Sequence, residues 1–213
     1  MAKQQETYPA RLDVEYPGVL DRFTTFFRLL WSIPIVIVIT VLSGSGTESY
    51  VNEAGATVSS NSGGIVFGLF AATALMIIFR QRYPKWWFDF NLELNRFSTR
   101  VCAYLLLLTD RYPSTTDKQT VQLDLDYPDV KKDLNRYLPL VKWFLAIPHY
   151  FVLFFLAICV LVATVVAWFA ILFTGKYPKD LFDFVVGVGR WGLRVAAYAF
   201  LLTTDKYPPF SLD

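Results

Sequence analysis

Cysteine and histidine are scarce in this sequence, and their few copies form no recognisable site. Cys102 and Cys159 lie inside apolar runs with no partner at metal-ligand spacing, and His149 is the single histidine. No serine, cysteine or carboxylate stands at the spacing of a nucleophile or general-base motif. The pattern favours a protein that is not an enzyme, with no catalytic residue, no metal and no cofactor.

Charged residues are also few, at 18% of the chain, and the formal net charge is only +2. This charge is too small to indicate nucleic acid as a partner, and no glycine-rich phosphate loop follows a predicted strand. Apolar residues, in contrast, make up 54% of the sequence. Such a composition is unusual for a water-soluble surface and predicts a membrane protein.

Several phrases occur twice in the same order, which predicts an internal duplication. LDVEYP at 12–17 matches LDLDYP at 123–128, and RYPKWWFDF at 82–90 matches KYPKDLFDF at 176–184. The phrases LLLLTDRYP and LLTTDKYP each close an apolar run with Thr, Asp, a cation and Tyr-Pro. We expect two tandem repeats, at residues 1–118 and 119–213.

The expected fold class is an all-α membrane protein in which each repeat contains a transmembrane helical hairpin. The first hairpin is predicted at about 26–42 and 65–80, on either side of a polar loop from Ser43 to Gly64. The second is predicted at about 138–156 and 159–174, with a bend near Ala157 and Ile158. These spans are short for a bilayer, so re-entrant or partly inserted hairpins stay open as an alternative.

Two further elements complete each predicted repeat. An amphipathic helix follows each hairpin, at about 86–109 and 180–203, and is expected to lie in the membrane interface. Six crossings, with both of these helices spanning, is the alternative. A short cytoplasmic strand precedes each hairpin, in RLDVEYP and VQLDLDYP, and the two strands could pair.

The distribution of cations predicts the orientation. None of the 20 Lys and Arg residues lies between Leu29 and Phe79 or between Trp143 and Gly175, so both hairpin tips lack positive charge. The positive-inside rule then places both termini in the cytoplasm, in a multi-pass protein. The 43–64 loop, with Glu48 and Glu53, would face outside.

Five residues are candidates for a binding role. Arg96 with Arg100, and Arg190 with Arg194, stand one helical turn apart and could hold the headgroups of anionic phospholipid. The alternative is that they pair with acidic residues of the same unit, namely Asp89, Glu93 and Asp183. His149 lies inside an apolar run, where it could make a polar contact with a neighbouring helix or contact a ligand, a proton or a partner.

The order LDxxYP, LAIPHYFVLFFLAI and WFAILFTGKYPKDLFDFVVGVGRWGLRVAAYAFLLTTDKYPPF resembles the bacterial integral membrane proteins of the domain of unknown function 4389 family. The first copy departs from this pattern, with Ile35 where the second has His149 and with the polar insert. The resemblance implies a bacterial inner-membrane location and no known activity.

We expect an accessory or scaffold subunit of a membrane complex, in contact with inner-leaflet lipid and a membrane protein partner. A lipid-binding or transport protein that uses the groove between the repeats is the alternative, and an enzyme that uses His149 is a weaker one.

Overall fold

The computed structural model describes residues 8–43, 47–51, 57–61, 65–115, 117 and 119–213. Its elements, in chain order, are β1 (Ala10–Val14), α1 (Arg22–Phe26), α2 (Arg28–Ser43), β2 (Thr47–Val51), β3 (Thr57–Asn61), α3 (Ile65–Leu75), the π-helical turn η1 (Met76–Arg80), α4 (Lys85–Leu105), β4 (Val121–Leu125), α5 (Val130–Asp133), α6 (Pro139–Leu145), α7 (Ile147–Thr174) and α8 (Lys179–Ala199). The fold is mostly helical, as predicted. It is not purely helical, because it contains two small sheets.

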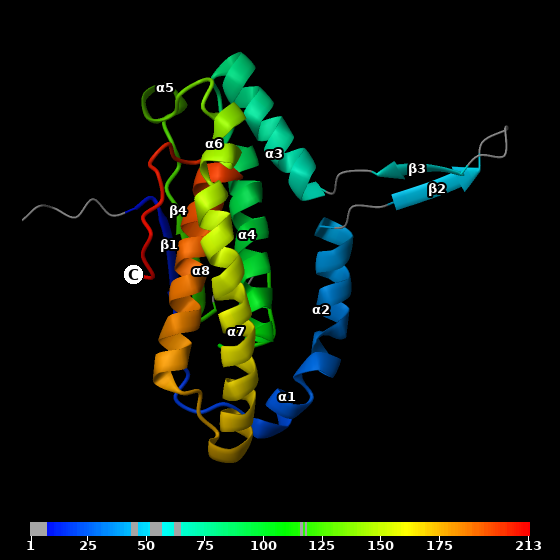
Figure 1. Ribbon diagram of the computed structural model, residues 1–213, viewed down its shortest axis with the longest axis vertical. Helices are drawn as coiled ribbons and strands as arrows, with labels where there is room; N and C mark the ends of the chain where they lie inside the picture. Colours follow the sequence, from blue (N-terminus) through cyan, green and yellow to red (C-terminus); the bar gives the residue numbers. More distant parts are fainter. Residues whose placement is uncertain (1–7, 44–46, 52–56, 62–64, 116, 118) are drawn as a thin grey trace, which may run out of the picture.

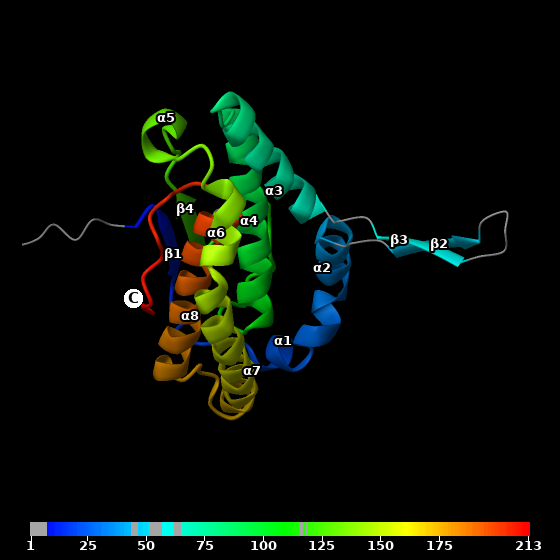
Figure 2. The ribbon, with the colours of Figure 1, turned by 45° about the horizontal axis from the view of Figure 1, so that its top comes forward.

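The elements form three layers, which Figures 1 and 2 show from two directions. The apolar helices α1, α2, α3, α6 and α7 make one outer layer. The long helices α4 and α8 lie in the middle. The β1–β4 pair covers the other side, where β1 contacts α8 and β4 contacts α4.

The predicted pairing of the two strands is confirmed. β1 and β4 pair antiparallel, with Leu12 directly opposite Leu123. These two leucines are the first residues of LDVEYP and LDLDYP, so the centre of the sheet lies between matching positions of the duplicated phrase. Buried side chains alternate with exposed ones along β4, as expected for a strand with one face on the core.

The predicted bend near Ala157 and Ile158 is wrong. α7 runs without interruption from Ile147 to Thr174, which at about 1.5 Å per residue is about 42 Å. The segment contains no glycine or internal proline that would break it, and it ends only where Gly175 adopts a positive φ of 73°. The second hairpin is therefore one long helix, preceded by the short α6.

The first hairpin is also wrong as an arrangement, although its two helices are close to their predicted bounds. Figures 1 and 2 show α2 and α3 following one another along the long axis of the molecule, rather than lying side by side. The polar insert between them was expected to be a loop, but its described parts, β2 and β3, pair as an antiparallel hairpin. A hairpin returns the chain near its starting point, so the helical path continues in its original direction.

The amphipathic helices were predicted in the right places, and α4 and α8 correspond to them. Each begins after a Tyr-Pro, with Pro84 and Pro178 as the N-cap residues. Both helices were predicted to lie in the membrane interface. α8 does not have such an exposed position, because α7 packs on one side of it and β1 on another. The apolar face of α8 is buried in protein.

Candidate functional site

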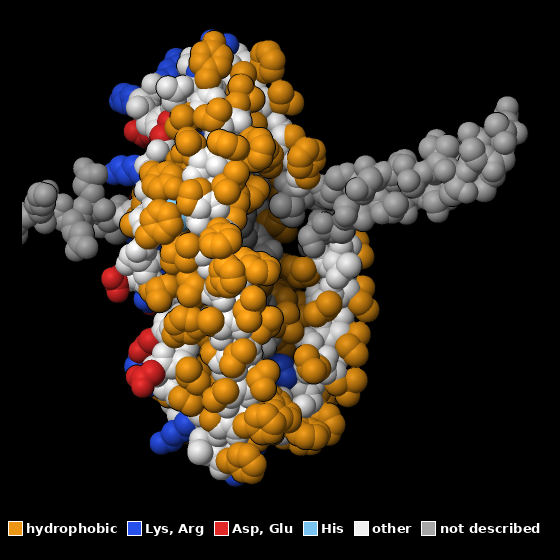
Figure 3. Space-filling model, viewed as in Figure 1, with side chains coloured by type: hydrophobic (Ala, Val, Ile, Leu, Met, Phe, Trp, Pro, Cys, Tyr) orange, Lys and Arg blue, Asp and Glu red, His pale blue; other side chains and the backbone are white. Residues whose placement is uncertain are grey.

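The outer layer of helices presents a continuous apolar face. In Figure 3, hydrophobic side chains cover α6 and α7 from end to end and continue over α1, α2 and α3. Beyond the first turn of α7, its buried residues form one narrow stripe of Val160, Ala163, Ala167 and Ile171. Large side chains such as Phe151, Phe154 and Phe173 are more than 60% exposed. Exposed apolar area on this scale is typical of surfaces that contact lipid or another protein.

One helix of this face can cross a membrane by its length and composition. Among the described residues, α7 is the single helix that meets both criteria, and only 17% of its most apolar window is buried. A core helix of a soluble protein would be mostly buried, so α7 is unlike one. The helices 28–41 and 67–80 are apolar but shorter.

Beneath the apolar face lie two buried cations that the sequence analysis did not single out. Arg28 is 2% exposed and Lys142 is 0% exposed. Arg28 forms an ion pair with Asp110 and donates to the Thr109 carbonyl at 2.6 Å. Lys142 forms an ion pair with Asp205 at 2.6 Å and donates to the carbonyl of Thr204 at 2.7 Å.

These two sites share further details. Each aspartate also accepts a backbone N–H, from Asp21 for Asp110 and from Asn135 for Asp205. Each cation lies over a tyrosine ring, Tyr104 for Arg28 and Tyr198 for Lys142. The repeated Thr-Asp-cation-Tyr-Pro phrase thus supplies, twice, the carbonyl and carboxylate that neutralise a buried cation.

The repeated phrases LLLLTDRYP and LLTTDKYP, called the exit phrases because each follows an amphipathic helix, contain backbone strain at matching positions. Leu107 and Leu202 both have positive φ, at 64° and 56°, which costs a non-glycine residue about 1 kcal/mol or more. The turn brings the following Thr carbonyl and Asp carboxylate to the cation. Burial lowers the pKa of Lys142, and the neighbouring Asp205 opposes this shift.

A signal for these cations was present in the sequence. Arg28 stands five residues before Ile33-Pro34, and Lys142 stands five residues before Ile147-Pro148. Both belong to the matched order of the two halves. A cation repeated at the same place before an apolar helix is the sequence pattern that indicates these sites.

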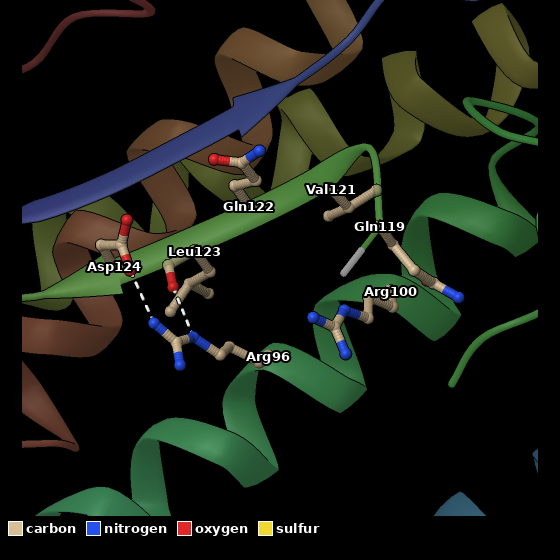
Figure 4. Close-up of a pocket in the computed structure, with 7 residues that line it drawn as sticks. All are labelled: Arg96, Arg100, Gln119, Val121, Gln122, Leu123 and Asp124. Atoms are coloured by element: carbon tan, nitrogen blue, oxygen red, sulfur yellow. Dashed lines mark hydrogen bonds and ion pairs between the residues drawn. The ribbon is translucent and has the colours of Figure 1, made fainter. Parts of the chain in front are cut away.

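The four arginines that were predicted to hold lipid headgroups do not form one site. Arg96 and Arg100 line a cavity of about 270 Å³ between α4 and β4, shown in Figure 4, together with Gln119, Val121, Gln122, Leu123 and Asp124. Arg96 donates to the Leu123 carbonyl at 2.8 Å and pairs with Asp124 and Glu93. Arg100 donates to the Ser114 carbonyl.

Arg190 and Arg194 lie on α8 and hold different segments. Arg190 donates to the Leu12 carbonyl at 2.9 Å and approaches Asp13 at 3.6 Å. Arg194 donates to the carbonyls of Ser211 and Asp213. The guanidinium groups of all four arginines therefore already bind protein oxygen atoms.

Acidic partners were expected within the same unit, and one of the three is found. Glu93 pairs with Arg96, whereas Asp89 and Asp183 pair with Lys85 and Lys179 on their own helices. Arg96 and Arg190 instead reach across to the strand from the other half of the chain. This contact fixes β4 on α4 and β1 on α8.

His149 lies at the start of α7 and is fully buried. Its Nδ1 accepts a hydrogen bond from Trp191 Nε1 at 3.0 Å, and the Phe210 ring stacks on it with centroids 4.0 Å apart. Tyr207 also contacts the imidazole ring. The histidine joins α7 to α8 and to the segment after α8, and the Nε2 atom has no hydrogen-bond partner among the described residues.

No group of three or more His, Cys, Asp or Glu side chains is placed to hold a metal ion in the part of the chain that the structure describes.

The fold and its exposed face define a mostly helical protein with one apolar helix able to span a membrane. Residues 139–211, about a third of the chain, match the family described as Domain of unknown function (DUF4389). The matched region contains α6, α7, α8 and the second exit phrase. No curated protein and no solved structure matches the chain.

Proposed function

We propose that this is a non-catalytic membrane protein that embeds in the inner leaflet of the cell membrane and acts as an accessory or scaffold subunit. The observation that carries the proposal is the continuous apolar face of α1, α2, α3, α6 and α7. At about 25 cal/mol per Å² of apolar surface removed from water, transfer of this face into lipid is strongly favourable.

The distribution of charge supports a position parallel to the membrane. The β1–β4 pair runs beside α8, and its side chains Arg11, Asp13, Asp124 and Asp126 are all at least half exposed. If α7 crossed the bilayer along its own axis, these charges would enter the hydrocarbon layer, where each costs at least about 2.5 kcal/mol. With the apolar face lying on the membrane, the strands stay in water.

The dimensions favour the same position. α7 is longer than the hydrocarbon core of about 30 Å, whereas a single layer of helices about 10 Å thick fits into one leaflet. The exposed cations Arg22, Arg80 and Lys176 lie next to the ends of the apolar helices. We assign contact with anionic headgroups to these cations rather than to the four arginines bound by the protein.

In this arrangement the two halves of the chain are copies of one unit, and both have the same relation to the membrane. Both termini and the β1–β4 side then face the cytoplasm. That side is available to a protein partner, which is the scaffold role. Arg96, Arg100, Arg190 and Arg194 act there by holding the strands and the last segment in place.

A second function is favoured by one cavity. Residues of α3, α4 and α8 line about 200 Å³ of space in the region where the two halves of the chain meet. A lipid-binding or transport protein would use such a space. The two functions share the membrane face and differ in whether a lipid is held specifically.

Flotation tests the membrane proposal directly. The purified chain, diluted from detergent into vesicles of phosphatidylethanolamine and phosphatidylglycerol, should float with the vesicles and stay bound after washing with 1 M salt. Salt screens headgroup contacts but does not weaken apolar insertion. Paired substitutions Phe151→Asp and Phe154→Asp, on exposed positions of α7, should release the protein. A wild-type chain that stays in the soluble fraction would refute the proposal.

A further inference from the structure

The cavity between α3, α4 and α8 has apolar walls and a polar floor. Leu69, Phe70, Leu94, Ala196, Phe200 and Leu201 provide the walls. Thr73, Asn91, Asn95 and Ser98 provide the polar groups.

The polar floor is a feature of one half of the chain only. At the matching positions of α8, 94 residues later, Asn91 corresponds to Val185, Asn95 to Gly189 and Ser98 to Gly192. α8 packs against α7, which is one uninterrupted helix. α4 instead contacts α2, which the polar insert separates from α3. Since the second half folds without these polar groups, the shared architecture does not require them.

The hydrogen bonds of the floor limit what can bind. Asn91 donates from its side-chain nitrogen to the Trp87 carbonyl at 2.9 Å, and Asn95 donates likewise to the Asn91 carbonyl at 2.8 Å. Each amide keeps its oxygen as an acceptor and its second N–H as a donor. A hydroxyl group, which both donates and accepts a hydrogen bond, fits them.

Charge limits the ligand further. Among the described residues, those that line this cavity include no Lys, Arg, His, Asp or Glu. A phosphate or carboxylate would lose its hydration without an opposite charge to replace it, which is costly in an apolar environment. A neutral group is therefore favoured over a charged headgroup.

We infer that this cavity, lined by Asn91, Asn95 and Ser98, binds the hydroxyl end of a neutral membrane lipid of the diacylglycerol type. This rests on the proposed membrane function, because the lipid chains would extend from the cavity into the leaflet that receives the apolar face. The space of about 200 Å³ holds a glycerol backbone and the first methylene groups, but not a protein helix.

Photocrosslinking distinguishes this from general lipid contact. The chain is placed in phosphatidylcholine vesicles that contain trace diacylglycerol or phosphatidylglycerol, each with a diazirine in the same acyl chain. Diacylglycerol should crosslink to 69–73 and 91–98 at least fivefold more than phosphatidylglycerol does. The variant Asn95→Leu with Ser98→Ala should remove this excess, since each lost hydrogen bond weakens binding about fivefold.

Thr40→Val is the matched control, because it removes an exposed hydroxyl of α2 that donates to the Val36 carbonyl. It should leave the crosslinking unchanged, and circular dichroism should show equal helix content in all variants. Equal labelling by both lipids, or labelling unaffected by the Asn95 and Ser98 substitutions, would overturn the inference. Flotation of the same samples separates this outcome from failure of the membrane proposal, because a chain without the lipid site would still float.

Discussion

Lys142 Nζ lies 2.6 Å from Asp205 Oδ1, and the lysine side chain is fully buried. The same relationship joins Arg28 to Asp110 in the first half of the chain. Each pair ties the start of an apolar helix to the segment that leaves the following amphipathic helix. The repeated exit phrase is explained by this contact, because its aspartate neutralises a cation that the fold buries.

Replacement of Lys142 by methionine should destabilise the protein strongly. The change leaves Asp205 partly buried without its cation, and breaking a buried pair from one side costs about 3–5 kcal/mol. Thermal unfolding in mild detergent, followed by tryptophan fluorescence, should give a clearly lower midpoint. The double variant Lys142→Met with Asp205→Asn should recover part of the loss.

Lys132→Met is the control for this experiment. Lys132 pairs with Asp129 on the surface, and its side chain is 81% exposed, so the substitution should change the free energy of unfolding by less than about 1 kcal/mol. Equal losses of stability for the two lysine substitutions would show that the buried pair stabilises the protein no more than a surface pair does.

The arginines should act on the strands that they hold. Arg190→Ala removes the bond to the Leu12 carbonyl, so amide hydrogen exchange should become faster in β1. Arg96→Ala should have the same effect on β4 through Leu123. Lys132→Ala, which removes an exposed pair with Asp129 away from both strands, is the comparison. Unchanged exchange in both strands would contradict this assignment.

His149 should hold the segment after α8 in place. His149→Ala removes the ring that stacks on Phe210 and the acceptor for Trp191. Trypsin should then cleave after Lys206 several-fold faster than in the wild type, as read by mass spectrometry. His149→Phe keeps the ring and should protect the segment more than alanine does. Equal cleavage in all three proteins would rule out this docking role.

The continuity of α7 can be measured as a distance. With Cys102 and Cys159 replaced by alanine, spin labels at Phe151→Cys and Val165→Cys occupy exposed positions. A straight helix separates these Cα atoms by about 21 Å. A bend near residue 157 would bring them to about 10 Å, the spacing of two packed helices, and a distribution centred there would contradict the fold.

The sequence predicted much of the local structure. LDVEYP and LDLDYP indicated strands that pair, and the periodicity after each Tyr-Pro indicated α4 and α8. The second hairpin was predicted because the charge-free run 143–174 is longer than a bilayer core as a single helix, and its bend was placed by taking the polar insert at 43–64 as a turn that both halves share. An insertion can also branch from the side of a helical path, and hydropathy alone does not distinguish the two.

The role of the arginines was also beyond the sequence. Arg96 and Arg190 bind backbone carbonyls of Leu123 and Leu12 in the opposite half of the chain. Every residue has a backbone carbonyl, so the sequence does not show which carbonyl an arginine binds. The arginines were therefore predicted to bind lipid phosphates. The polar floor at Asn91 was hidden for a different reason, since it depends on how far α3 lies from α4.

Sidedness of labelling at the two ends of α7 tests the central claim most directly. In a chain without native cysteines, Lys132→Cys lies beyond one end of α7 and Lys176→Cys beyond the other. A membrane-impermeant maleimide should label both positions in inverted vesicles and neither in intact cells, because the proposed arrangement places the apolar face in the inner leaflet. Labelling of the two positions from opposite sides of the membrane would mean that α7 crosses it, and would contradict the account.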